Sequence, residues 1–379
     1  MLKNNLHKAA VALCLLFMCF RVSAQVNLDS LKTEINLMVY NNPEEAIRKA
    51  KEAYPLIKED DTTLKITYLL TIANAYAILK KHDEVMETAL QAKNIADTKG
   101  TPLNKIQVLG FIAGEYRRLQ LNDKALVYIN QAEKIYKTAT IPDSLKYFGG
   151  NILFVKGLIQ KDNLGCEYAL PYFNEAAQIF KADTQRKINA VSFCIASNNA
   201  GDCYIQLNDL EAAKENFTET IKYAESVNAT QGAAYGKMGL SRVLKREGNY
   251  KEAVALLNEV LDEVKNLNDA SMKSQLYREL SEDYLSIEDF EKHEYYNKLA
   301  LEEEKKLSDE EKKSLNKVAN KISVENKKSE QEQSKKLTLI IVAISFLLLV
   351  ILLIMFLKIR KKRRSLEQKR SDMEDNQKK

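Results

Sequence analysis

The 379-residue sequence has few of the residues that interrupt helices, with 12 Gly and 5 Pro, and it contains no Trp. It also lacks runs of alternating apolar and polar residues bounded by turn residues, which would indicate β-strands. These shortages exclude most β-rich architectures. They predict an all-α protein.

Residues that commonly build metal sites and catalytic centres are equally scarce. The chain has three histidines and five cysteines, and no Cys-x-x-Cys spacing. It has no Gly-x-Ser-x-Gly, P-loop, His-Glu-x-x-His or Gly-x-Gly-x-x-Gly motif. We therefore expect no catalytic residues, no metal site and no cofactor, and predict that the protein is not an enzyme.

One long apolar run stands out, LTLIIVAISFLLLVILLIMFL at residues 337–357, with 21 residues and no charge. At about 1.5 Å per residue, a helix of this length crosses the roughly 30 Å hydrocarbon core of a bilayer. A buried core helix would be shorter and amphipathic. The run therefore predicts a single transmembrane helix.

The N-terminus has the pattern of a secretory signal peptide. Lys3 and Lys8 precede an apolar run at residues 9–20, and the small-residue sequence Val22-Ser23-Ala24 follows. Twelve apolar residues are too few to span a bilayer. We predict that residues 1–24 are removed, together with Cys14 and Cys19.

Charge predicts the orientation of the chain across the membrane. Residues 358–379 hold 10 Lys and Arg against 4 Asp and Glu, a net charge of +6, and residues 25–336 hold 44 against 48, a net charge of −4. The positive-inside rule places the basic tail, residues 358–379, in the cytoplasm and residues 25–336 in the periplasm. A basic run beside a bilayer is more typical of contact with anionic lipid than of nucleic-acid binding, so we expect no direct nucleic-acid binding. The predicted location is the inner membrane, with a single span.

Between residues 28 and 299 the chain reads as short amphipathic helices in pairs. A small residue recurs early in the second helix of each pair, with substitutions at two places and intervals of 39, 40, 44, 44, 40 and 40 residues. Such spacing is typical of a repeat array, because a single helix pair cannot bury its apolar face alone. The marker positions are Ala46, Val85, Ala125, Ala169, Ala213, Ala253 and His293.

These pairs resemble the tetratricopeptide repeat (TPR) family. The first helix of a pair holds an apolar residue, a small residue and then Tyr, and the second holds small and apolar residues at fixed offsets. Two examples are Ile72, Ala73, Tyr76, Val85, Ala89 and Ala92, and Ile112, Ala113, Tyr116, Ala125, Ile129 and Ala132. The spacing near 40 residues exceeds the family's period of about 34. The resemblance implies a solenoid of about seven pairs over residues 25–300.

In this family the first helices line a concave face, and solvent-facing positions on them are candidates for a ligand groove. Arg and Lys are prominent among them, so we expect the groove to bind an extended peptide or an acidic protein segment. The alternative is a solvated helix face without a ligand. The positions are Asn74, Arg117, Arg118, Lys161, Asp202, Arg242, Lys245, Arg246 and Glu282.

Three cysteines remain after removal of the signal peptide. Cys194 and Cys203 are nine positions apart on one predicted helix and face opposite sides, so they cannot join each other. Cys166 and Cys203 flank a turn near Asp183 at similar distances, and antiparallel packing could bring them together. Either these two form a disulfide in an oxidising periplasm, or all three are buried free thiols.

Residues 301–336 are charged throughout and predict a long exposed linker helix. Leu315, Val318 and Ile322 have coiled-coil spacing, but the seam is shorter than the three or four heptads that identify a coiled coil. A solvated single helix and a homodimer both remain open.

The order of these segments resembles the sensory half of membrane-anchored TPR regulators of Bacteroidetes, in which a helix-turn-helix output domain follows the membrane helix. The 22 residues at 358–379 are too few for such a domain. Three interpretations stay open. They are a periplasm-facing sensor or adaptor that binds a protein or peptide and acts in signal transduction, the truncated input half of a transcriptional regulator, and a structural envelope scaffold.

Overall fold

The computed structural model describes residues 28–182, 187–267 and 269–376, so the predicted signal peptide at 1–24 lies outside it. Over these residues the chain is helical and has no strand, which confirms the all-α prediction. The chain divides after Leu315 into two units.

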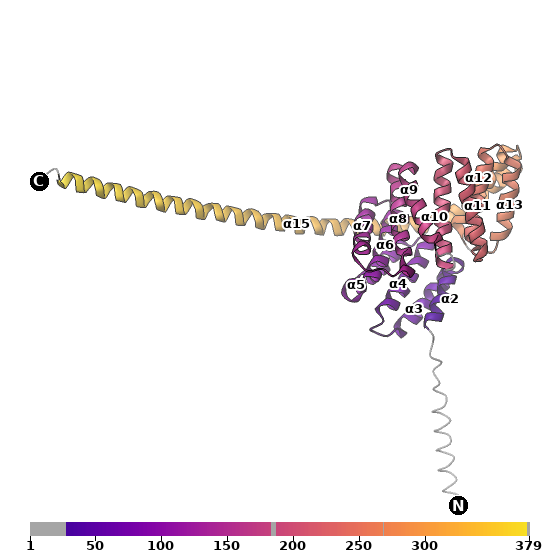
Figure 1. Cartoon of the computed structure of the whole chain (residues 1–379), viewed down its shortest axis with the longest axis horizontal. Coiled ribbons are helices and arrows are strands. Elements are labelled where there is room, and N and C mark those ends of the chain that lie inside the picture. The colour runs from indigo at the N-terminus through magenta and orange to yellow at the C-terminus, as the bar shows by residue number, and fades with distance from the viewer. Residues whose placement is uncertain (1–27, 183–186, 268, 377–379) are drawn as a thin grey trace, which may run out of the picture. The chain divides into compact units, whose positions relative to one another are not determined.

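The first unit is a stack of seven helix pairs, as the repeat spacing predicts (Figure 1). Two short 3-10 segments, η1 (Tyr54–Leu56) and η2 (Asp143–Leu145), lie in the connections. The first helices of the pairs are α2 (Leu28–Asn41), α4 (Thr62–Ile78), α6 (Pro102–Arg118), α8 (Tyr147–Leu164), α10 (Lys187–Gln206), α12 (Thr230–Arg246) and α14 (Ala270–Ser286). The second helices are α3 (Pro43–Ala53), α5 (His82–Lys99), α7 (Asn122–Thr138), α9 (Cys166–Lys181), α11 (Leu210–Ser226), α13 (Tyr250–Val264) and the start of α15 (Phe290–Asn376).

The same turn closes the first helix in five of the pairs. One residue adopts a left-handed conformation, as Lys80 does with φ of 57°, and the next amide donates to a carbonyl five residues earlier, as Lys81 does to Tyr76 at 3.0 Å. This turn repeats at Gln120, Asn208, Gly248 and Glu288. In the fourth pair the turn shrinks to the single residue Gly165, with φ of 93°.

The small marker residues of the second helices are buried, which explains the repeat pattern. Ala125, Ala169 and Ala213 are fully buried, and Val85 is buried in the same way although it is larger. Small side chains at these positions allow neighbouring helices to approach closely. His293 departs from the pattern, because it is half-buried and its Nδ1 lies 2.9 Å from Ser281 Oγ.

Helix α15 runs without a break from Phe290 to Asn376. Within the described residues it contains one segment, Thr338–Leu366, that is long and apolar enough to cross a membrane. This segment overlaps the apolar run at 337–357.

Candidate functional site

Charged side chains on the first helices join the third pair to the fourth, and they join the sixth pair to both the fifth and the seventh. Arg117 on α6 donates to Asp162 on α8 through Nε at 2.6 Å and Nη2 at 3.0 Å. A two-pronged contact of this kind fixes the guanidinium orientation as well as its charge. We call such contacts the inter-pair ion pairs.

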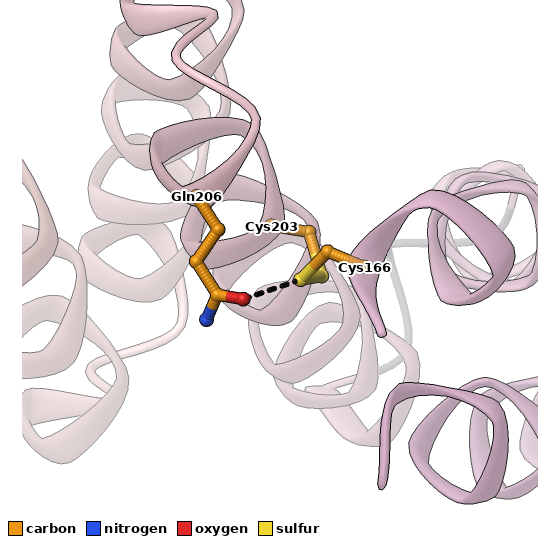
Figure 2. Close-up of a disulfide and its surroundings, with 3 residues drawn as sticks. All are labelled: Cys166, Cys203 and Gln206. Carbon is orange, nitrogen blue, oxygen red and sulfur yellow. Dashed lines mark hydrogen bonds between the residues drawn. A yellow bond between two sulfur atoms is a disulfide. The ribbon is translucent and has the colours of Figure 1, made fainter. Parts of the chain in front are cut away.

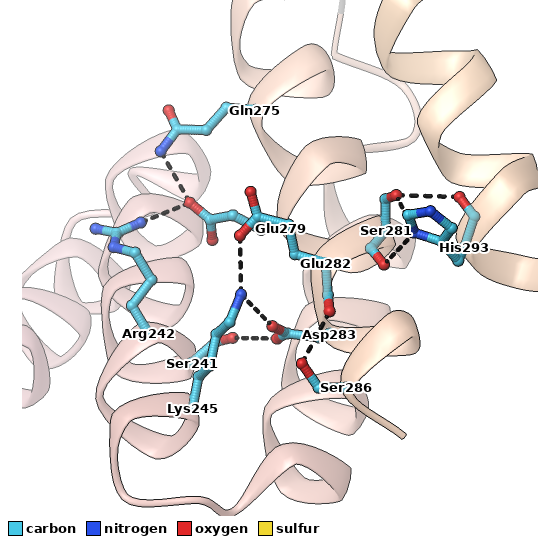
Figure 3. Close-up of polar contacts among 10 residues, drawn as sticks. All are labelled: Ser241, Arg242, Lys245, Gln275, Glu279, Ser281, Glu282, Asp283, Ser286 and His293. Carbon is cyan, nitrogen blue, oxygen red and sulfur yellow. Dashed lines mark hydrogen bonds and ion pairs between the residues drawn. The ribbon is translucent and has the colours of Figure 1, made fainter. Parts of the chain in front are cut away.

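Arg242 on α12 makes inter-pair ion pairs in two directions, and Figure 3 shows the one with Glu279. Its Nη1 lies 2.7 Å from Glu279 on α14, and its Nη2 lies 2.5 Å from Asp202 on α10. One side chain therefore links three successive first helices. Burial raises the pKa of the Glu279 carboxyl above its ordinary value of 4.5, and the positive charge of Arg242 opposes that shift.

Lys245 makes a second link from α12 to α14. Its Nζ lies 2.8 Å from Glu282 and 3.0 Å from Asp283, whose side chain is buried (Figure 3). Arg246, next along α12, lies at the longer distance of 3.4 Å from Asn208 Oδ1.

The structure brings four of the nine predicted groove positions into contact, because Arg242 pairs with Asp202 and Lys245 pairs with Glu282. Arg117, Arg242 and Lys245 each contact a carboxylate of a neighbouring pair. Asn74 is exposed, and neither its side chain nor that of Lys161 contacts a charged partner among the described residues. The groove positions predicted from the sequence include the acids Asp202 and Glu282, but they omit Asp162, Glu279 and Asp283.

A second polar cluster, which the sequence reasoning did not find, lies at the turn between α4 and α5. His82 Nδ1 lies 2.5 Å from Glu115 Oε1, and both side chains are buried. Arg118 Nε donates to the other oxygen of Glu115 at 2.8 Å. Glu311 of α15 approaches from the other side, with its Oε1 3.3 Å from His82 Nε2. With a carboxylate at each ring nitrogen, His82 fits best as the doubly protonated imidazolium.

The protonation of this cluster follows from its surroundings. Burial favours the neutral imidazole, but the contacts with Glu115 and Glu311 outweigh it and raise the pKa of His82 above 6.5. Burial likewise opposes ionisation of Glu115, yet His82 and Arg118 lower the pKa of its carboxyl below 4.5. The two groups therefore hold each other in their charged forms.

A polar cavity of about 650 Å³ lies beside this cluster. Its wall combines the ends of first helices with the turns that follow them, and one residue comes from α15. The lining residues are Lys80, His82, Arg117, Arg118, Gln120, Asn122, Asp162 and Glu311.

Cys166 and Cys203 are joined in the structure as a disulfide, with Cα atoms 5.0 Å apart (Figure 2). The bond ties the start of α9 to α10, and Gln206 Oε1 lies 3.2 Å from Cys166 Sγ. Cys194 is free and buried, and burial raises the pKa of its thiol to about 12. Within the described residues, no group of three or more His, Cys, Asp or Glu side chains could hold a metal ion.

No family model and no curated protein matches this sequence. Solved structures do match the fold. NprR in complex with its cognate peptide NprX has a TM-score of 0.53 and 14% identity over 85% of this chain and 88% of that chain. The apo form of RapI has a TM-score of 0.50 and 15% identity over 75% of this chain and 78% of that chain. The fold is that of a tetratricopeptide repeat protein.

A TPR sensor is also named among the similar structures, in a signal transduction ATPase from Pyrococcus horikoshii. It has a TM-score of 0.46 and 19% identity over 73% of this chain and 41% of that chain. At these identities the likeness concerns the TPR fold alone.

Proposed function

We propose that this chain is a membrane-anchored, non-enzymatic TPR protein whose first-helix face binds a protein or peptide in the periplasm and which acts in signal transduction. The observation that supports it most is the set of inter-pair ion pairs on that face. A structure with the same fold, NprR, is described as a complex with its cognate peptide.

The inter-pair ion pairs suit recognition of an extended chain. Arg117 lies on α6, and Arg242 and Lys245 lie on α12. With their partners on α8 and α14 they cover four first helices, so an extended ligand could contact several of them in turn. A ligand carboxylate can replace an Asp or Glu side chain as the partner of one of these Arg or Lys donors, because one charge-assisted hydrogen bond is then exchanged for another. Lys161, which has no such partner among the described residues, is the easiest to recruit.

The membrane anchor is proposed from three features of the chain. The N-terminal pattern is that of a signal peptide, Thr338–Leu366 is long and apolar enough to span a bilayer, and a basic tail follows the apolar run. Helix α15 contains both the second helix of the last pair and the candidate span. A change in the last pair therefore acts on the same helix that enters the membrane.

The test is capture of the ligand by the full chain in detergent, with crosslinking in its native envelope, followed by affinity measurement with the captured partner. Two charge reversals, Lys161→Glu and Arg246→Glu, alter the first helices without breaking a close ion pair. We expect them to weaken binding at least tenfold, about 1.4 kcal/mol.

Matched controls are Lys214→Glu and Lys251→Glu, which reverse exposed charges on the second helices α11 and α13. These should leave affinity within twofold of the parent. Equal losses in both sets would show that net charge, and not the first-helix face, governs binding. Unchanged affinity in both sets would reject the proposed face.

A further inference from the structure

Helix α15 returns to the second pair through a contact that spans most of the chain. Ser314 Oγ donates to Asp83 Oδ1 at 2.8 Å and accepts from the Asp83 amide at 3.0 Å. The first amides of a helix have no partner within that helix, and among the described residues the side chain of Lys81 does not cap α5. Ser314 therefore supplies the missing cap. We call Glu311 and Ser314 with His82 and Asp83 the α15–α5 contact.

The other half of this contact places a carboxylate at the edge of the cavity. Glu311 Oε1 lies 3.3 Å from His82 Nε2, and Glu311 belongs to the cavity lining. Its side chain is one-third exposed, so solvent reaches it. Glu311 and Ser314 are three positions apart on α15 and thus share one face, so the two interactions form and break together.

Without Glu311, the cavity has more positive than negative charge. Three cations line it, namely Lys80, Arg117 and Arg118. Arg117 pairs with Asp162, and Arg118 pairs with the buried Glu115. Lys80 forms no ion pair among the residues that the structure describes. A protonated His82 would add a further positive charge.

We propose that this cavity is a binding site for a carboxylate ligand, that Glu311 is its built-in competitor, and that ligand binding releases α15 from the second pair. A volume of about 650 Å³ suits a small organic acid or the end of a peptide, since ligand pockets commonly hold roughly 300–1,000 Å³. Lys80 and the free guanidinium nitrogens of Arg118 are the donors that bind it. The cavity shares Arg117 with the face proposed above, but Lys80, His82 and Glu311 do not belong to that face, so a site built on them goes beyond the proposed function.

Release follows from competition for the same donors. A ligand carboxylate beside His82 and Lys80 excludes the Glu311 carboxylate, and Ser314 then leaves Asp83. Because α15 has no break up to Asn376, the released segment belongs to the helix that holds the candidate span.

The experiment uses the full chain in detergent with three probes, namely succinate, acetylated tri-alanine with a free carboxylate, and the same peptide as its amide. Binding is measured by calorimetry, and amide hydrogen exchange is followed over residues 305–315. We expect a carboxylate probe to bind, the amide not to bind, and exchange in this segment to rise on binding. Binding of succinate alone identifies a free acid as the ligand source, and binding of the peptide acid alone identifies a peptide terminus.

Three variants separate this proposal from a general charge effect. Glu311→Gln should tighten probe binding about tenfold if the α15–α5 contact is closed nine-tenths of the time. Lys80→Gln should weaken binding at least fivefold, whereas Lys81→Gln, the neighbouring charge that does not line the cavity, should leave it unchanged. The proposal is overturned if no carboxylate probe binds, if the amide binds equally well, or if Glu311→Gln leaves affinity unchanged. None of these results bears on binding at Lys161 and Arg246.

Discussion

His82 Nδ1 lies 2.5 Å from Glu115 Oε1 inside the first unit, although the two residues belong to different helix pairs. The pair is buried and is extended by Arg118 on one side and Glu311 on the other. It joins the second pair, the third pair and α15 at one point. Its protonation therefore affects how the array is held together.

Stability should depend on pH through this pair. The raised pKa of His82 gives a contribution that is complete below pH 6.5 and is lost as pH rises through the folded value. The lowered pKa of Glu115 gives a contribution to stability that is complete above pH 4.5 and is lost as pH falls through the folded pKa. The pair therefore stabilises most between pH 4.5 and 6.5.

The measurement is the urea midpoint of the full chain between pH 5 and 9, for the parent and for His82→Asn. Other charged residues lie at this turn and stay unchanged in every variant, namely Lys80, Asp83, Arg118 and Glu311. We expect the parent to lose stability toward alkaline pH and His82→Asn to lose this slope. His293→Asn serves as the control and should keep the slope of the parent. A parallel slope in His82→Asn would contradict the assignment.

Gly239 on α12 should not tolerate a side chain. A Cβ there would overlap the ring of Phe217, which is fully buried on α11. We expect Gly239→Ala to destabilise the protein by about 1–3 kcal/mol, because the packed core cannot absorb the extra methyl group. At Gly110 a Cβ would meet no described atom within 4 Å, so Gly110→Ala should be neutral or stabilising by up to about 1 kcal/mol.

The clash at Gly239 can be tested by a double-mutant cycle with Phe217→Leu. The smaller side chain leaves room for the new methyl group, so the two substitutions should cost less together than separately. Chemical denaturation gives the four stabilities. Additive losses would mean that Gly239 is required for some reason other than the Phe217 ring.

Arg242 and Arg246 lie on the same helix but should differ in importance for stability. Arg242→Ala leaves Glu279 and Asp202 without their shared partner, and the Glu279 side chain is only 13% exposed. We expect a loss of about 2–4 kcal/mol, whereas Arg246→Ala should change stability by less than about 0.5 kcal/mol. Adding Glu279→Gln to Arg242→Ala should recover part of the loss, because it removes the buried charge. Equal effects at both positions would show that the inter-pair ion pairs contribute little.

The disulfide should stabilise the fourth and fifth pairs. It closes a chain segment with a sequence separation of 37, for which the loop-entropy model gives about 4 kcal/mol. We expect reduction, or Cys203→Ser, to lower the urea midpoint. Cys194→Ala keeps the disulfide, so reduction or added Cys203→Ser should lower its midpoint as well. Mass analysis of the unreduced chain after removal of residues 1–24 should show one alkylated thiol, at Cys194, and only after unfolding. Three alkylated thiols would rule out the bond.

Reporter fusions test the proposed orientation in the membrane. A phosphatase that folds only in the periplasm should be active when fused after Lys335 and inactive when fused after Lys379, because the candidate span lies between them. A reporter that is fluorescent only in the cytoplasm should give the opposite result. An active phosphatase at Lys379 would contradict a cytoplasmic tail.

Residue patterns along the chain are sufficient to predict the repeated elements. Each helix pair follows local rules, since small residues such as Ala125 and Ala213 mark helix contacts and residues such as Gly248 permit the left-handed turn. These rules act within about 40 positions and recur, so the all-α class and the seven pairs could be predicted. The candidate membrane span at 337–357 could be predicted in the same way, because it requires only that the length of an apolar helix match the thickness of the bilayer.

Which charged side chains pair with one another depends on how the helix pairs pack. Arg117 contacts Asp162, and Arg242 contacts Glu279, because each helix pair is rotated relative to the next. The size of this rotation cannot be predicted from a local residue pattern. The contact of Ser314 with Asp83 joins residues 231 positions apart, and it depends on the accumulated rotation of the whole array. Small changes per pair add up over such a distance, which is why the cluster around His82 was invisible in the sequence.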